Sequence, residues 1–192
     1  MRTLRWIGLL AVVATLLISA ACHADVVWDF DDPAEITIIK NFDPNEVANG
    51  RFAGFSQWDP YVSLQVPEVG INANELTWLT VRLYSSAEAD VLDIYYGSPD
   101  GRWCLGGVLP IHRGWATYRL DLTQNNWRET RTGDVSKQWG GPSKQVTSFR
   151  IDPGNQADRW IMVDSVRLHA AEAGLEQGVV EEPMGTATLR EF

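Results

Sequence analysis

The feature that most constrains this chain is a series of short segments in which apolar and polar residues alternate. Turn-forming pairs such as Asp32-Pro33, Asp59-Pro60 and Arg113-Gly114 separate them. Because side chains of a β-strand point alternately to opposite faces, this pattern is typical of half-buried strands. The predicted strands cover residues 26–31, 35–40, 51–57, 61–65, 76–84, 91–96, 103–109, 116–122, 146–151 and 160–168. The sequence therefore predicts an all-β fold, an antiparallel β-sandwich or barrel.

The N-terminal segment 1–24 is predicted to be a signal peptide, because Arg2 and Arg5 precede an apolar stretch that ends in small residues. Cleavage after Ala24 would give a secreted or periplasmic chain. An alternative is a lipid anchor at Cys22, since the residues before it resemble a lipobox in which Ser19 replaces the usual Leu. No later stretch approaches the roughly 20 apolar residues of a membrane span.

The rest of the chain divides into a single domain over residues 25–169 and a tail over residues 170–192. The tail is acidic and poor in aromatic residues, so we expect it to be flexible. The net charge of −9 becomes −11 without Arg2 and Arg5, which argues against nucleic acid or an anionic membrane as partner. Cys104 is then the one cysteine left, which predicts a small buried residue and no internal disulfide.

Two stretches, GWATYRLDLTQ and VTSFRIDPGNQADRWIMVDSVRL, together with WDFDD near the mature start, resemble jelly-roll domains of the galactose-binding-like and carbohydrate-binding-module kind. The resemblance covers most of residues 26–168. It implies a jelly-roll fold that binds sugars, and we expect no catalytic domain within residues 25–192. It also implies a structural calcium ion at the matching positions Asp29, Asp31 and Asp164, whose carboxylates suit a hard cation.

Tryptophan is abundant, and flat aromatic rings pack well against the apolar faces of sugars. Trp28 is expected in the core of the sandwich. Four others lie next to Pro, Gly or polar residues in segments that look like loops, and are candidate ligand contacts: Trp58, Trp103, Trp127 and Trp139. The alternative is that these rings also belong to the core.

A second candidate surface follows from the alternation, since the polar sides of segments 76–84, 116–122 and 146–151 would share one face if the strands are neighbours. Its candidate contacts are Trp78, Arg82, Tyr84, Arg119 and Arg150. Guanidinium groups bind carboxylates and stack on aromatic rings, so this face could hold uronate or sulfate groups. The alternative is a solvated face whose arginines pair with Asp93, Asp121 or Asp152.

Catalytic patterns are poor: His112 and His169 stand alone, and neither a serine elbow nor an HExxH motif occurs. The predicted function is therefore a secreted, non-catalytic module that binds a polysaccharide or other glycan, with calcium as a structural ion. One alternative is a structural or adhesive protein of the cell envelope that self-associates through a sheet edge or its tail, where Thr186 to Leu189 could form a strand. Another is a small polysaccharide lyase or hydrolase.

Overall fold

The computed structural model describes residues 24–88 and 90–183, and there the alternating segments form strands as predicted. The elements are β1 (Val26–Trp28), η1 (Pro33–Glu35), β2 (Ile36–Val47), β3 (Phe52–Leu64), β4 (Ile71–Asn72), β5 (Trp78–Ser85), β6 (Asp90–Gly97), β7 (Trp103–Ile111), β8 (Gly114–Asp121), β9 (Arg128–Glu129), β10 (Gln145–Val146), β11 (Ser148–Pro153), β12 (Arg159–His169) and β13 (Gly178–Glu181). The described ranges contain no helix long and apolar enough to cross a membrane. Two sequence predictions lie outside the described residues: the signal peptide up to residue 23, with Cys22, and the possible strand from Thr186 to Leu189.

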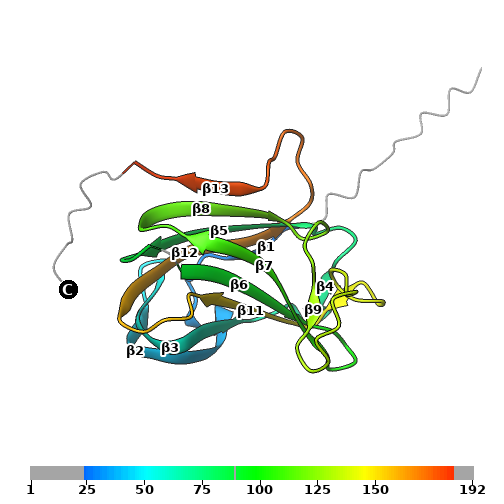
Figure 1. The fold of residues 1–192 in the computed structure, drawn as a ribbon, viewed down its shortest axis with the longest axis horizontal. Coiled ribbons are helices and arrows are strands. Elements are labelled where there is room, and N and C mark those ends of the chain that lie inside the picture. The colour runs from blue at the N-terminus through cyan, green and yellow to red at the C-terminus, as the bar shows by residue number, and fades with distance from the viewer. Residues whose placement is uncertain (1–23, 89, 184–192) are drawn as a thin grey trace, which may run out of the picture.

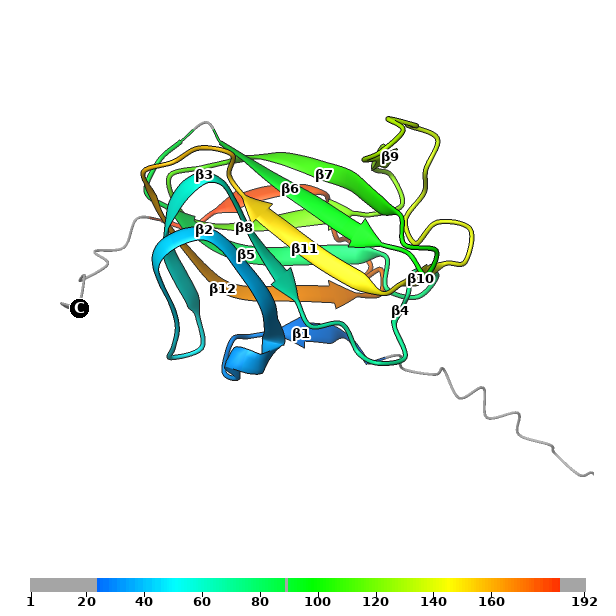
Figure 2. The same cartoon turned by 90° about the horizontal axis from the view of Figure 1, so that it is seen from below.

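The strands pair in the order β13-β8-β5-β12-β3-β11-β6-β7-β9, with β1 beside β12 and β2 beside β3. Figures 1 and 2 show that this sheet is folded into two layers packed face to face. We name them the β8 layer (β13, β8, β5, β12, β1 and the first half of β3) and the β11 layer (the second half of β3, β11, β6, β7 and β9). The all-β class and the antiparallel sandwich are confirmed.

The long strand β3 passes from one layer to the other. Its residues Phe52 to Ser56 pair with β12, whereas Val62 to Leu64 pair with β11. The bend falls at Asp59, which has a φ of 54°, and there the side chain of Asn41 donates hydrogen bonds to the carbonyls of Trp58 and Asp59 at 2.7 and 2.9 Å. The Asp59-Pro60 pair was predicted to separate two strands, and instead it bends one.

The space between the layers is filled by apolar side chains, including Trp28, which stacks on Phe149 at 5.5 Å between ring centroids. Trp28 was expected in the core and lies there, 2% exposed. Cys104 is also buried as predicted, and burial raises the pKa of its thiol. A free, protonated thiol in this place is a packing residue and not a nucleophile.

The segment after β12 was expected to be a flexible tail from residue 170, and this boundary is wrong in part. Gly178 to Glu181 form β13, which pairs with β8 as an edge strand of the same sheet. Figure 1 shows the connection rising away from the body before the chain returns as β13. The domain therefore extends to at least residue 182, whose backbone N–H donates to the carbonyl of Trp115 at 3.0 Å.

Candidate functional site

The outer face of the β11 layer carries a compact polar and aromatic group around Arg150. Register places Arg150 of β11 opposite Ser63 of β3 on one side and opposite Tyr95 of β6 on the other. Its guanidinium carbon lies 3.6 Å from the ring centroid of Tyr61 and 4.5 Å from that of Tyr95. Cation–π contacts of this kind fix both rings and the guanidinium in one arrangement. We call Tyr61, Tyr95 and Arg150 the central triad.

The charge of Arg150 is compensated within its own strand. Its Nε and Nη2 donate to the two carboxylate oxygens of Asp152 at 2.6 and 2.5 Å, and Asp152 is 1% exposed. This confirms the alternative in which an arginine of the predicted face pairs with Asp152. Burial raises the pKa of Asp152 to about 6, with the carboxylates of Asp93 and Asp59 adding to the effect and Arg150 opposing it.

Tyr95 is a neutral hydrogen-bonding group on this face. Burial, followed by the nearby charges of Asp152 and Asp93, raises the pKa of its phenol to about 12. The register also places Asp93 of β6 directly opposite Asp152. The face thus brings a phenol and a guanidinium together with two buried carboxylates in one small area, and the phenol and guanidinium suit a ligand rich in hydroxyl groups.

Two exposed tryptophans lie on strands that run beside the central triad. Trp58, 71% exposed, stands at the bend of β3, and Trp103, 37% exposed, lies at the start of β7. Trp103 pairs with Gly97, and Gly97 pairs with Ser148, two residues before Arg150. A hollow of about 190 Å³ lies at this end, lined among others by Trp103, Ile38 and Ser148. Trp58 and Trp103 therefore keep their status as candidate contacts.

Trp127 and Trp139, the other two candidates, are core residues, so their assignment as exposed loop contacts is wrong. They are 0% and 2% exposed, and their indole N–H groups donate at 2.8 Å to the carbonyls of Leu122 and Leu76. The two indoles stack at 5.4 Å. A Cβ at Gly106 would stand 2.7 Å from the ring of Trp127, so the missing side chain there makes room for it.

The predicted arginine face is divided between the two layers. Arg82 and Tyr84 of β5 and Arg119 of β8 lie on the outer face of the β8 layer, with Trp78 8% exposed at one end, whereas Arg150 lies on the β11 layer. A shared face is therefore wrong for Arg150. The alternation assigned each side chain to the correct side of its own strand, but strand neighbours depend on pairings between distant parts of the chain.

On the β8 layer, Arg82 is held from several directions. Its Nε and Nη2 bind Glu182 at 2.7 and 2.8 Å, its Nη1 lies 3.0 Å from Asp164, and its guanidinium carbon is 4.4 Å from the ring centroid of Trp115. Asp164 also accepts from Arg51 at 3.3 Å. Asp164 and Glu182 of the chain itself thus already compensate the charge of Arg82.

The calcium prediction is not supported by the residues named for it. Asp164 is bound to Arg51 and Arg82, and the described ranges contain no group of three or more His, Cys, Asp or Glu side chains placed to hold a metal ion. Asp29 accepts a hydrogen bond from the backbone of Asp31 at 3.3 Å instead. Asp29, Asp31 and Asp164 therefore do not fit a shared calcium site, because two guanidiniums neutralise Asp164.

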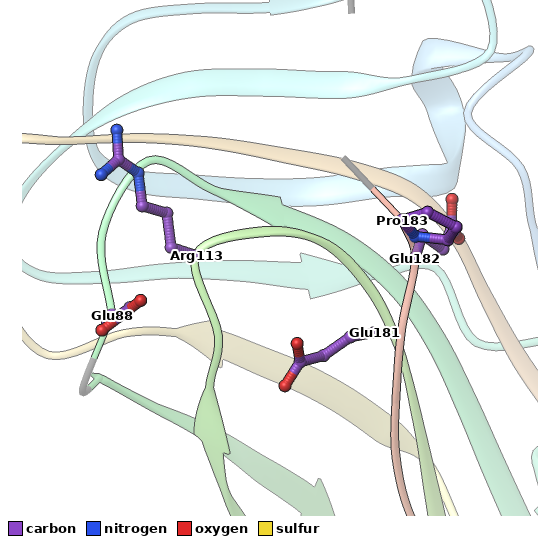
Figure 3. A pocket seen from close by; sticks show the side chains of 5 residues that line it. All are labelled: Glu88, Arg113, Glu181, Glu182 and Pro183. Carbon is purple, nitrogen blue, oxygen red and sulfur yellow. The ribbon is translucent and has the colours of Figure 1, made fainter. Parts of the chain in front are cut away.

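The histidines have structural surroundings. His169 is 2% exposed, and its Nε2 lies 3.0 Å from the hydroxyl of Thr80. His112 lies 2.9 Å from Glu181. A hollow of about 730 Å³ lies beside Glu181 and is lined by Glu88, Arg113, Glu181, Glu182 and Pro183, whose side chains are drawn in Figure 3. Its described lining residues include no aromatic ring and carry both signs of charge, so the β11 layer is the better candidate for a ligand.

Tyr61, Tyr95 and Asp93 were not among the residues predicted to contact a ligand. The signal was present in the alternation, since Tyr61 and Ser63, and likewise Asp93 and Tyr95, occupy the polar positions of segments 61–65 and 91–96. What the sequence does not show is that β11 lies between these segments and brings them together around Arg150.

These features define a fold class: an all-β antiparallel jelly-roll sandwich whose β11 layer carries exposed aromatic residues. No family model matches the sequence, and no curated protein matches it. Among solved structures, the fold is similar to part of the agarase AgWH50C, with a TM-score of 0.56 and 12% identity over 78% of this chain and 25% of the agarase. It is also similar to part of PfGH50B, with a TM-score of 0.50 and 12% identity over 70% of this chain and 22% of that one.

A mutant of a family 29 carbohydrate-binding module gives a TM-score of 0.48 at 9% identity, over 76% of this chain and 90% of the module. By contrast, the chain spans only about a quarter of the length of the agarase. At these identities the likeness to the agarase and to PfGH50B shows the fold alone.

Proposed function

We propose that this chain is an exported, non-catalytic carbohydrate-binding module whose ligand lies on the outer face of the β11 layer. The observation that carries the proposal is the central triad, on a layer whose strands also bear the exposed rings of Trp58 and Trp103. Aromatic rings stack on the apolar faces of sugars, and the polar groups between them orient the hydroxyls. The fold shared with part of an agarase supports a role in polysaccharide recognition.

The ligand proposed is a neutral glycan. The guanidinium of Arg150 already donates from Nε and Nη2 to Asp152, so its positive charge is compensated by the chain before any uronate or sulfate arrives. Asp93 and Asp59 lie near enough to Asp152 to raise its pKa, so the surroundings are acidic. An anionic sugar would meet repulsion there, whereas a neutral sugar would find acceptors for its hydroxyls.

A polysaccharide lyase or hydrolase is the competing function for the same face, and the adjacent carboxylates of Asp93 and Asp152 are the observation that favours it. A raised carboxyl pKa is typical of catalytic acids. However, Asp152 is 1% exposed and both of its oxygens are bound by Arg150, so neither oxygen can reach a substrate. We therefore propose that the pair is structural. Release of reducing ends from any bound polysaccharide would contradict this.

The test is a binding panel of neutral polysaccharides, including agarose, a mixed-linkage β-glucan and a β-mannan, and of anionic ones such as alginate. We expect at least one neutral polymer to bind, and the Trp103→Ala variant to bind it about 10- to 100-fold more weakly, equivalent to about 1–3 kcal/mol. The matched control is Trp115→Ala, which removes a partly exposed indole from the opposite layer. No binding to any polymer, or loss in Trp115→Ala alone, would overturn the proposal.

A further inference from the structure

The C-terminal strand β13 joins the sheet in a way that a second copy of the chain can reproduce. It pairs with β8 through four residues, Gly178 to Glu181, and the last contact is made by Glu182 on Arg82. β13 packs little of its own surface against the core, since Val179 alone among its residues touches the core cluster and Val180 is 48% exposed. Its attachment is therefore mainly backbone hydrogen bonds, together with the contacts of Glu181 with His112 and of Glu182 with Arg82.

The strand end is also loosely packed against the rest of the molecule. The hollow of about 730 Å³ lies between the last residue of β13, Glu181, with the two residues that follow it, and the side chains of Glu88 and Arg113 (Figure 3). Figure 3 shows these two groups of side chains on opposite sides of the opening. An edge strand with few buried side chains and an open hollow at its end is expected to open locally at little cost compared with global unfolding.

The connection to β13 has to pass over two strands. Since β5 and β8 lie between β12 and β13, the two strands are three sheet spacings apart, about 14 Å. The connection, residues 170–177, is largely exposed and turns at Gly174, with a φ of 79°. An extended chain of this length reaches about 25–30 Å, so it can span to its own β8 or open toward another molecule.

We propose that β13 is an exchangeable strand and that two copies of this chain associate by trading it. In the exchanged dimer, Gly178 to Glu181 of one copy pair with β8 of the other, and Glu182 enters the Arg82 site of that copy. Every contact of the closed form is regained between molecules, so the two forms differ mainly in the conformation of the connection. Without a strand there, β8 would leave the backbone groups of its outer edge unpaired, and such edges attract strands.

The direct test uses two single-cysteine variants of the full chain, with Cys22 and Cys104 replaced by Ser. One carries Thr117→Cys on β8 and the other Val180→Cys on β13, positions that face each other in the register. Directly opposite residues of an antiparallel pair have Cα atoms about 4.5–5.5 Å apart, within the range that a disulfide needs. We expect the concentrated, oxidised mixture to form a covalent heterodimer.

The matched control replaces the donor by Glu176→Cys, an exposed position in the connection that has no partner in the register. This control mixture should give no more heterodimer than random collision of thiols. If the Thr117→Cys and Val180→Cys mixture gives no more than the control, strand exchange does not occur and the proposal is wrong.

A second variant shortens the connection so that β13 cannot pair with β8 of its own chain. Removal of residues 171–176 leaves a connection of two residues that spans about 10 Å, less than the roughly 14 Å between β12 and β13. We expect this variant to be a dimer by light scattering. A folded monomer, with a circular dichroism spectrum and cooperative melting like those of the parent, would overturn the proposal, because the edge of β8 would then remain without a strand from either source.

Discussion

The two outer faces of the sandwich use the same three kinds of group in different ways. Each carries an arginine stacked on an aromatic ring and bound by carboxylates, Arg150 on the β11 layer and Arg82 on the β8 layer. On the β11 layer the acid is Asp152, two residues away on the same strand and fully buried. On the β8 layer one acid, Glu182, comes from a segment 100 residues away that ends an edge strand.

The two ion pairs differ in whether they can separate without a change in the surrounding sheet. Arg150 and Asp152 cannot separate without a change in β11 itself. Glu182 leaves Arg82 whenever β13 detaches. One face is therefore a fixed surface suited to a ligand, and the other is a contact that depends on the C-terminal strand.

The largest effect is expected from breaking the fixed pair. Arg150→Met leaves the buried carboxylate of Asp152 without its partner, which should cost about 3–5 kcal/mol of unfolding free energy at pH 7. The corresponding Arg82→Met should cost about 1 kcal/mol, because its partners are partly exposed. Equal losses in the two variants, measured by urea denaturation, would remove the distinction between the faces.

The pH dependence of Arg150→Met sharpens the same comparison. Burial raises the pKa of Asp152 to about 6, so the folded state favours the neutral carboxyl. The contribution of this group to the free energy of unfolding is fully present below pH 3.8, its usual pKa, and is lost as the pH rises through about 6. Arg150 opposes this rise in pKa, so its removal moves the pKa further up. The deficit of Arg150→Met relative to the parent should therefore shrink as the pH falls from 7 to 5. The double variant Arg150→Met/Asp152→Leu should show no such trend.

A medium effect is expected at the exposed end of the β11 layer. Trp58→Ala should weaken glycan binding by about 1–2 kcal/mol if the ligand extends to the bend of β3. Because Trp58 is 71% exposed, the melting temperature should change little. Titration calorimetry with the bound polymer and its shorter oligosaccharides measures this; an unchanged affinity for every length would place the ligand between Tyr61 and Trp103 only.

A smaller effect is expected from the removable contact. Glu182→Gln should cost about 0.5–1 kcal/mol at pH 7, because one side of the Arg82 pair is lost at a half-exposed position. The hydrogen bond from Arg82 lowers the pKa of Glu182 in the folded protein. The contribution of Glu182 to the free energy of unfolding is therefore present above pH 4.5, the usual pKa of the group, and is lost as the pH falls through the lowered pKa. A loss that persists in strong acid would argue against the ion pair as its source.

The smallest effect is expected from salt. If the ligand is neutral, raising the salt concentration from about 0.1 to 1 M should change the affinity by less than about twofold, although the Debye length falls from about 10 to 3 Å. Hydrogen exchange of the β13 amides should accelerate over the same range, because the Arg82–Glu182 pair is screened. A steep loss of affinity with salt would indicate an anionic glycan.

The fold class followed from the sequence because side-chain alternation is a local property of each strand. The site followed only in part. The sides of β5, β8 and β11 were predicted correctly, but the neighbours of β11 are β3 and β6, and those pairings join residues about 55 to 90 positions apart. Tyr61 and Tyr95 meet Arg150 through these pairings alone.

The tryptophan error has a different cause. Trp127 and Trp139 are surrounded by polar and turn-forming residues, which is a loop signal, and the segment is indeed irregular. Their indole N–H groups are satisfied by carbonyls, in the case of Trp139 by Leu76, 63 residues away. No local pattern indicates that an irregular segment sends its rings back into the core.

The passage of β3 through both layers has a consequence for how the chain folds. The local partner of β3 is β2, but the strands that attach it to the two layers, β11 and β12, are made last among the long strands. A nascent chain can form the β2–β3 hairpin early, yet neither layer is joined to the other until residues 148–163 have emerged. Because the two layers are joined by pairings between residues far apart in the sequence, we expect folding to be slow and all-or-none.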